Sequence, residues 1–128
     1  MKQLDDDYGF QQIARFNSPQ YVIDHMKFLY EKYNVSYIFL ADENLTSNRK
    51  RTHELCDLMI QEGLPEKVKW GTGGDSASVN DELVHHMKQA GCTFITFGGE
   101  SASDKVLKYD IQKGTTRKNN QDAVDIMK

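Results

Sequence analysis

The chain has 128 residues, of which 38% are hydrophobic and 27% charged, and its formal net charge is -3. This length suits one modest domain, and the even spread of charge argues against nucleic acid or an anionic membrane as the main partner. No stretch approaches the roughly 20 apolar residues that span a bilayer, and the acidic start does not fit a secretion signal. We therefore expect a cytoplasmic protein with neither partner.

The sequence offers few residues for nucleophilic or metal chemistry. Its two cysteines, Cys56 and Cys92, are too far apart for a CxxC knuckle, and we expect both to be small buried hydrophobic residues. No phosphate-binding loop and no Ser/His/Asp arrangement occurs, so we assign no catalytic residue and no metal ligand. The four histidines, which form no obvious ligand set, are His25, His53, His85 and His86.

The first half of the chain predicts two helices and two strands after a linker or truncated loop at residues 1–17. Ser18 and Pro19 start a helix over 19–33, and Asn34 closes it. The uncharged run 35–40 predicts a strand covered on both faces. A helix over 48–62 ends near Gly63 and Pro65, and a short strand follows at 68–71.

The second half continues the alternation. A loop over 72–76 precedes a helix that Asn80 and Asp81 cap and Gly91 ends, and residues 92–97 form a third strand. A turn over 98–103, a short helix over 104–109 and a last helix from Thr115 complete the order αβαβαβα. Strands that are separated by one helix run parallel, so the three loops after them share one rim of an α/β fold.

Ligands of parallel α/β proteins bind at the carboxyl ends of the strands, and polar or glycine-rich segments follow all three strands here. Asp42, Glu43 and Asn44 can accept hydrogen bonds, although the same residues would equally cap the next helix. The other segments hold Gly74 and Asp75 after Thr72, and Glu100 and Ser101 after two glycines that permit close approach. The predicted binding residues are Asp42, Glu43, Asn44, Thr72, Gly74, Asp75, Gly98, Gly99, Glu100 and Ser101.

These segments, taken in order, resemble the radical S-adenosylmethionine (SAM) superfamily. The match begins at Tyr37–Thr46 (YIFLADENLT) and is most specific at Gly98–Ser101, followed by Val106-Leu107 and Lys113-Gly114. It also includes Trp70-Gly71, Glu82-Leu83, Met87–Cys92 and Thr115-Thr116. The branch that the chain is most similar to often carries a cobalamin-binding domain ahead of the radical SAM barrel.

The resemblance implies that residues 18–128 form about strands two to four of a partial (βα)6 TIM-type barrel. In such enzymes a [4Fe-4S] cluster cleaves SAM to a 5′-deoxyadenosyl radical, and some members also use cobalamin. Asp42, Glu43 and Asn44 would line the barrel mouth, and Glu100 with Ser101 would approach the ribose and methionyl part of SAM. The small-molecule substrate stays unknown.

The chain departs from the family in lacking the CxxxCxxC loop that holds the cluster. Many relatives also carry an arginine in the loop after the second strand of this chain, where Gly74-Asp75-Ser76 stands. We therefore expect a section of a radical SAM enzyme that is inert alone. The alternatives are a degenerate nucleotide- or nucleoside-binding α/β domain without catalysis, and a phosphosugar-type barrel that binds an anion. In each case the exposed sheet edges predict self-association.

Overall fold

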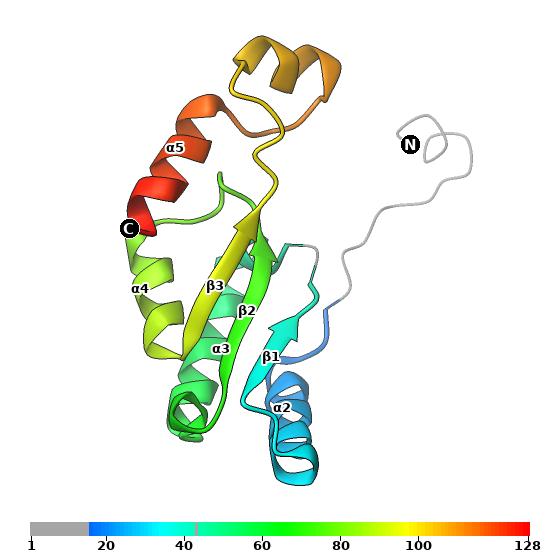
Figure 1. Ribbon diagram of the computed structural model, residues 1–128, viewed down its shortest axis with the longest axis vertical. Coiled ribbons are helices and arrows are strands. Elements are labelled where there is room, and N and C mark those ends of the chain that lie inside the picture. The colour runs from blue at the N-terminus through cyan, green and yellow to red at the C-terminus, as the bar shows by residue number, and fades with distance from the viewer. Residues whose placement is uncertain (1–15, 43) are drawn as a thin grey trace, which may run out of the picture.

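The computed structural model describes residues 16–42 and 44–128, so the predicted linker lies almost wholly outside the described residues, as does Glu43. The described chain alternates helices and strands, as Figure 1 shows. The longer elements are α2 (Pro19–Tyr33), β1 (Tyr37–Leu40), α3 (Arg49–Gln61), β2 (Lys69–Gly74), α4 (Asp81–Gln89), β3 (Cys92–Phe97) and α5 (Arg117–Ile126). The 3-10 turns η1 (Leu45–Ser47) and η2 (Leu64–Glu66) flank α3, and a π-helical turn, η3 (Val106–Asp110), follows β3.

The helix boundaries follow the capping residues of the sequence. Ser18 Oγ accepts a hydrogen bond from the Tyr21 amide at 3.2 Å, and Pro19 is the first residue of α2. Asn34 ends α2 in the left-handed conformation, with φ at 52°. Asn80 Oδ1 accepts from the Leu83 amide at 2.9 Å and so caps α4. These three predicted caps are confirmed.

The three strands form a parallel sheet in the order β1-β2-β3, which confirms the predicted parallel α/β arrangement. The predicted loop over 72–76 was placed too early, because β2 continues through Gly74. Thr72 pairs with Leu40 on one side and Ile95 on the other, so the ladder to both neighbours holds the glycine-rich segment extended. β1 is shorter than predicted and starts at Tyr37.

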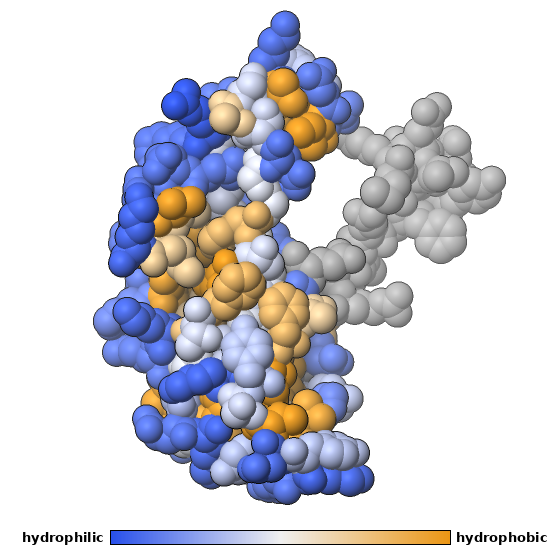
Figure 2. All heavy atoms as spheres, viewed as in Figure 1, coloured by the Kyte–Doolittle hydropathy of each residue, from blue (hydrophilic) through white to orange (hydrophobic). Residues whose placement is uncertain are grey.

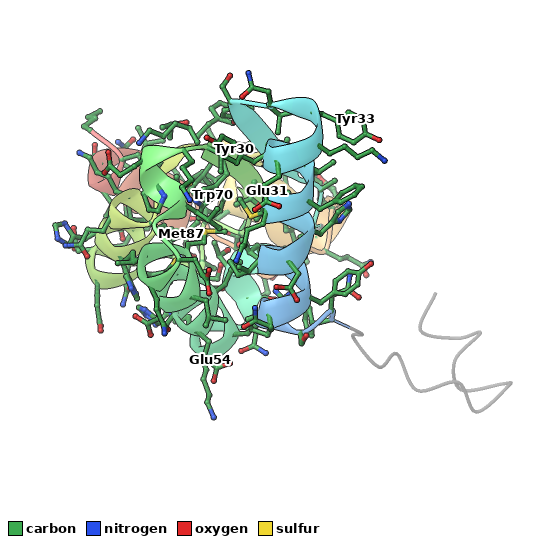
Figure 3. All side chains as sticks on the ribbon, turned by 90° about the horizontal axis from the view of Figure 1, so that it is seen from below. Tyr30, Glu31, Tyr33, Glu54, Trp70 and Met87 are labelled. Carbon is green, nitrogen blue, oxygen red and sulfur yellow. The ribbon has the colours of Figure 1, made fainter. Side chains whose placement is uncertain are left out.

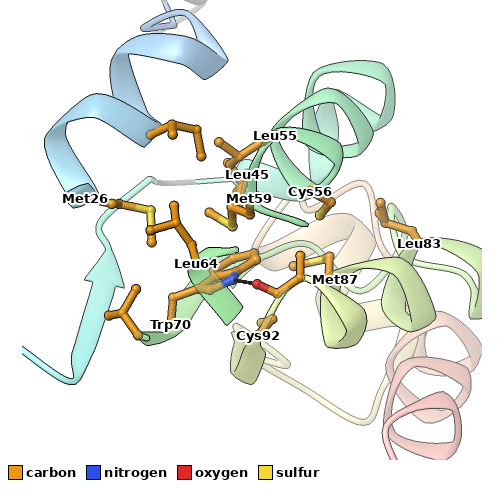
Figure 4. Close-up of a cluster of buried hydrophobic side chains, with 13 residues drawn as sticks. Met26, Leu45, Leu55, Cys56, Met59, Leu64, Trp70, Leu83, Met87 and Cys92 are labelled. Carbon is orange, nitrogen blue, oxygen red and sulfur yellow. Dashed lines mark hydrogen bonds between the residues drawn. The ribbon is translucent and has the colours of Figure 1, made fainter. Parts of the chain in front are cut away.

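One face of the sheet is covered by helices and carries the core. Trp70 is fully buried and donates its indole N–H to the Ala90 carbonyl oxygen at 2.9 Å (Figure 4). Figure 3 shows Trp70 directed into the interior, whereas Tyr33 and Glu54 point outward. Cys56 and Cys92 belong to this core, as predicted. The other core residues are Ile23, Met26, Leu45, Leu55, Met59, Leu64, Val68, Leu83, Met87 and Ala90.

The opposite face of the sheet is open in the described part of the chain. Tyr37, Phe39 and Phe94 are 45%, 48% and 52% exposed, and β-strand alternation places them opposite the helices. Figure 2 shows apolar side chains gathered over this face. The prediction of a strand covered on both faces at 35–40 was therefore wrong for the described residues, because all the large helices that pack on the sheet lie on one side.

The chain beyond β3 forms two short helical segments. The short helix that was predicted over 104–109 forms the π-helical turn η3, and α5 begins with Thr116 and Asn119 in a capping box. No helix in the described ranges has the length and apolar character needed to cross a membrane.

Candidate functional site

The loops after β1, β2 and β3 meet at the carboxyl rim of the sheet, as the parallel order requires. Buried hydroxyl groups join them. Thr46, in η1 after β1, is fully buried and accepts a hydrogen bond from the Asp75 amide at 3.1 Å. Its Oγ1 also donates to Asn44 Oδ1 at 3.1 Å and lies 2.5 Å from Ser78 Oγ. Thr46 therefore ties the first loop to the second.

A second tie connects the loop after β2 to the loop after β3 through α5. Ser76, which is 6% exposed, lies 2.8 Å from Thr115 Oγ1 and donates to Asn120 Oδ1 at 2.6 Å. Asn120 in turn donates its side-chain N–H to the Gly99 carbonyl oxygen at 2.9 Å. The three loops are thus one hydrogen-bonded unit, and side chains on them keep fixed relative positions.

The loop after β3 presents its carboxylate from an unusual backbone conformation. Glu100 has φ at 55°, in the left-handed region that costs non-glycine residues roughly 1 kcal/mol or more. Its Oε1 lies 3.4 Å from Lys113 Nζ, which also donates to the Gly98 carbonyl oxygen. A Cβ on Gly98 would fall 2.5 Å from that carboxylate oxygen, so a larger residue there would displace the Glu100 side chain. The Glu100 side chain is about half exposed.

Asp42 and Asn44 also serve the loop after β1. Asp42 Oδ1 accepts from the Asn44 amide at 3.1 Å, which closes a turn. Asp42 Oδ2 lies 3.8 Å from Arg51 Nη1. Both predicted site residues therefore have structural partners, but neither caps a helix with its side chain, since Asn48 caps α3 and Asn44 makes no such bond to η1. A binding role for them stays a prediction.

Thr72, Gly74 and Asp75 contribute to the same architecture. Thr72 is fully buried and donates its hydroxyl to the Leu40 carbonyl oxygen at 3.0 Å, which joins β2 to β1. A Cβ on Gly74 would lie 2.9 Å from Thr46 Oγ1, so the glycine lets the first loop approach closely. Asp75 Oδ1 accepts from the Ala77 amide at 2.8 Å.

A cavity of about 660 Å³ lies between α2 and β1, beside this rim. β1 is the edge strand of the described sheet, so its outer edge borders the cavity. The lining is apolar along α2 and β1 and becomes polar toward the rim, where Asp42, Asn44 and Arg51 contribute.

Arg51 forms the floor of the polar end of the groove and is only 9% exposed. Its Nε and Nη2 donate to the Asn17 carbonyl oxygen at 3.1 and 3.0 Å, and Phe16 lies against the guanidinium at 5.0 Å. Nη1 has no hydrogen-bond partner among the residues that the structure describes. Arg51 therefore fixes the entry of α2 against the loop after β1.

The two cysteines do not suit a metal cluster. Burial raises the pKa of Cys56 to about 12, and burial also raises the pKa of Cys92 to about 11. Iron-sulfur clusters are held by thiolates, so binding would have to remove the thiol protons at a cost that burial raises. In the described ranges no group of three or more His, Cys, Asp or Glu side chains is placed to hold a metal ion.

Sequence reasoning did not identify the residues that hold the rim together. Thr46 was part of the segment that resembles the family, and Ser76 stood in the loop after β2, yet nothing in the local sequence indicated that either residue bonds to a neighbouring loop. The role of Asn120 depends on α5 folding back over the rim, a contact across 44 residues to Ser76. The sequence predicted only that these loops consist of small and polar residues.

No family model matches the chain. Curated relatives do match, and they include the anaerobic magnesium-protoporphyrin IX monomethyl ester cyclase of Cereibacter sphaeroides, 37% identical over 94% of this chain and 20% of the relative. An uncharacterized methyltransferase of Pyrococcus horikoshii is 32% identical over 89% of this chain and 24% of its own length. The cytidylyl-2-hydroxyethylphosphonate methyltransferase of Streptomyces wedmorensis is 31% identical over 80% of this chain and 19% of its own length. The chain is homologous to about a fifth of each.

Proposed function

We propose that this chain is a section of a radical SAM enzyme, corresponding to about strands two to four of a six-stranded (βα)6 barrel. In the complete enzyme a [4Fe-4S] cluster would cleave SAM to start radical chemistry on a small molecule. This section would supply part of the SAM-binding rim. Without the cluster-binding loop it would have no activity of its own.

The arrangement of the sheet is the observation that carries this proposal. A barrel wall has helices on its outer face and side chains of the lumen on its inner face, and its strands follow in chain order. The described sheet has consecutive parallel strands, helices packed on one face, and an open face bearing Tyr37, Phe39 and Phe94. The groove beside β1 would take the preceding barrel strand.

The relatives support the same reading at the level of sequence. The segments that resemble radical SAM enzymes span most of the chain, and the matched relatives are named as a cyclase and methyltransferases. The chain matches only about a fifth of each relative, and the rest of each relative also contributes to its activity. We therefore propose no particular substrate. Cobalamin would bind outside this section.

At the rim, we assign the contact with SAM chiefly to Glu100 and Ser101. The left-handed φ of Glu100 turns its carboxylate away from the regular course of the loop, and such strain is often retained at binding sites. Gly98 and Gly99 allow a ligand to approach the backbone closely. Asp42, Glu43 and Asn44 would line the mouth, with Gly74 and Asp75 between the two sets.

The cluster itself does not fit the residues of this chain. The sequence holds two cysteines, both are buried, and both keep their protons at neutral pH. The cluster ligands would therefore come from outside this section. Reconstitution of the chain with iron and sulfide should leave it without bound cluster.

A cobalamin-binding domain of the Rossmann type is the second candidate, because an open parallel sheet with intervening helices is also the core of such domains. Complete doubly wound domains carry helices on both faces of the sheet and reverse strand order at the binding crevice. Three consecutive strands from one half of such a domain would do neither, like the described sheet. We rank the barrel section first because the segments after its strands resemble radical SAM enzymes.

Ligand-observed NMR on the chain separates these functions. We expect saturation transfer to S-adenosylhomocysteine that weakens in Glu100→Gln and persists in the control Glu66→Gln, which lies in η2 away from the rim. Transfer to adenosine that Glu100→Gln does not change would favour the degenerate nucleoside-binding domain. Binding of inorganic phosphate alone would favour the phosphosugar barrel, and binding of cobalamin the Rossmann-type domain.

A further inference from the structure

Two histidines meet on the helix layer, apart from the rim. His53 in α3 and His86 in α4 face each other with their Nδ1 atoms 2.7 Å apart. Their ring centroids are 5.0 Å apart and the planes are inclined by 29°. Asp57, one turn after His53, places Oδ1 3.2 Å from His86 Nε2. None of these residues belongs to the proposed SAM-binding rim.

The contacts direct one nitrogen of each ring at the other. The Asp57 carboxylate beside His86 Nε2 favours the tautomer that carries its proton there, which leaves Nδ1 of His86 facing His53. A histidine whose second nitrogen is held by a carboxylate has the usual environment of a metal ligand, because the carboxylate fixes the tautomer and raises the basicity of the ring. In the unliganded pair one proton lies between the two Nδ1 atoms.

Two imidazole nitrogens suit copper, nickel and zinc, and the geometry that each metal prefers sets how far apart the nitrogens must lie. For metal–nitrogen bonds of about 2.05 Å, two ligands at right angles are about 2.9 Å apart, and two tetrahedral ligands are about 3.3 Å apart. The 2.7 Å contact is that of the shared proton, so the rings must move apart to hold a metal, and they move less for the right-angled geometry. Copper(II) and nickel(II) prefer that tetragonal arrangement, whereas zinc prefers the tetrahedral one.

We propose that His53 and His86 form a two-nitrogen binding site for Cu²⁺ or Ni²⁺, with Asp57 orienting His86 and water completing the coordination. A small turn of both rings brings the two lone pairs onto the metal, which takes the place of the proton that they share. That proton is released to solvent, and no electron is transferred. The bound ion would cross-link α3 and α4 and stabilise the fold by mass action.

Competing ligands elsewhere in the described chain are weaker. Cys56 lies in α3 but is fully buried and protonated, and Cys92 is likewise a buried thiol. His85 is exposed on α4 beside the pair, and His25 lies on α2, so neither has a second imidazole facing it. These two histidines provide matched controls.

The test uses nickel chloride and the full chain. Calorimetry and thermal unfolding should show one Ni²⁺ bound per chain with a concentration-dependent rise in Tm, reversed by EDTA. The variants His53→Gln and His86→Gln should lose both effects, whereas His25→Gln and His85→Gln should keep them. Asp57→Asn should weaken binding by about 10- to 100-fold, the usual effect of removing the carboxylate behind a histidine ligand.

Electron paramagnetic resonance of the Cu²⁺ form supplies an independent readout, since its nitrogen couplings should indicate two imidazoles in the chain and not in either pair variant. Circular dichroism of the metal-free variants shows that they still fold, and a variant that does not fold is replaced by His→Asn at the same position. Absence of saturable binding, or binding that survives both pair variants, would overturn the proposal. Neither outcome bears on SAM binding at the rim.

Discussion

Thr46 shows how a single hydroxyl can organise the rim. It is fully buried, and its oxygen contacts groups from two loops, namely Asn44, Asp75 and Ser78. A methyl group in its place would leave the half-buried Asp75 amide without its partner and would remove one contact of the Ser78 hydroxyl, which keeps its bond to the Asp75 carbonyl oxygen. Such unsatisfied groups cost more than the bond itself contributed.

Thr46→Val should therefore lower the free energy of unfolding by about 1–3 kcal/mol, because it keeps the shape of the side chain and removes its hydrogen bonds. Urea denaturation followed by circular dichroism measures the change. Thr96→Val in β3 is the control, since Thr96 is exposed and its loss of a hydroxyl should change stability little. Equal effects in the two variants would contradict the role of Thr46.

The buried thiols predict a pH dependence of stability. Cys56 and Cys92 have pKa values raised by burial to about 12 and about 11, above the ordinary value of 9.0. Between pH 9 and these values the unfolded thiols lose protons while the folded ones keep them, so stability is fully present below pH 9 and falls as the pH rises toward 11–12. Cys56→Ser and Cys92→Ala together should flatten this part of the stability curve.

At the residue scale, local roles were predictable and long-range ones were not. Ser18, Asn34 and Asn80 were identified as helix boundaries because a cap interacts only with its own first or last turn. The partners of Thr46 and Ser76 lie up to 44 residues away. No spacing in the sequence encodes such contacts, since they depend on how the loops meet after folding.

At the level of elements, β2 depends on glycine where the sheet is crowded. A Cβ on Gly71 would fall 2.2 Å from the Tyr37 hydroxyl and 2.9 Å from the Phe94 carbonyl oxygen. The tyrosine can turn away, but the carbonyl belongs to the paired strand β3 and cannot move without disturbing the ladder. Glycine is a poor strand former, yet the packing of the open face requires it at this position.

Gly71→Ala should destabilise the fold by about 1–3 kcal/mol through this overpacking. Gly114→Ala is the matched control, because a Cβ there would meet nothing within 4 Å. Thermal unfolding of the two variants checks the difference. A Gly71→Ala protein as stable as the control would show that the open face is less crowded than described.

The sequence predicted the bounds of the helices more accurately than those of the strands. Their apolar periodicity and caps fix both type and length, whereas β2 carries three glycines and one lysine, which are poor strand formers on their own. The pairing of β2 with strands on both sides overrides that preference. Residues 72–74 of the predicted loop are strand because pairing within the sheet determines their conformation more than their own sequence does.

At the scale of the whole molecule, the described sheet is unusually exposed. Its apolar face bears three exposed aromatic side chains, and β1 and β3 are both edge strands. Unpaired edges and contiguous apolar surface promote association between chains. We expect the purified chain to sediment as a monomer only at low concentration. A single monomeric species across the accessible concentration range would contradict this proposal.

We propose that the loops after β1, β2 and β3 form a SAM-binding rim of a barrel section. Amide chemical-shift mapping with S-adenosylhomocysteine tests it most directly. We predict that the shifts concentrate at residues 42–46, 74–76 and 98–101, and that Glu100→Gln reduces those at 98–101. Shifts confined to α2 and the outer helix faces, or an absence of shifts at ligand concentrations that saturate known SAM-binding proteins, would contradict the account.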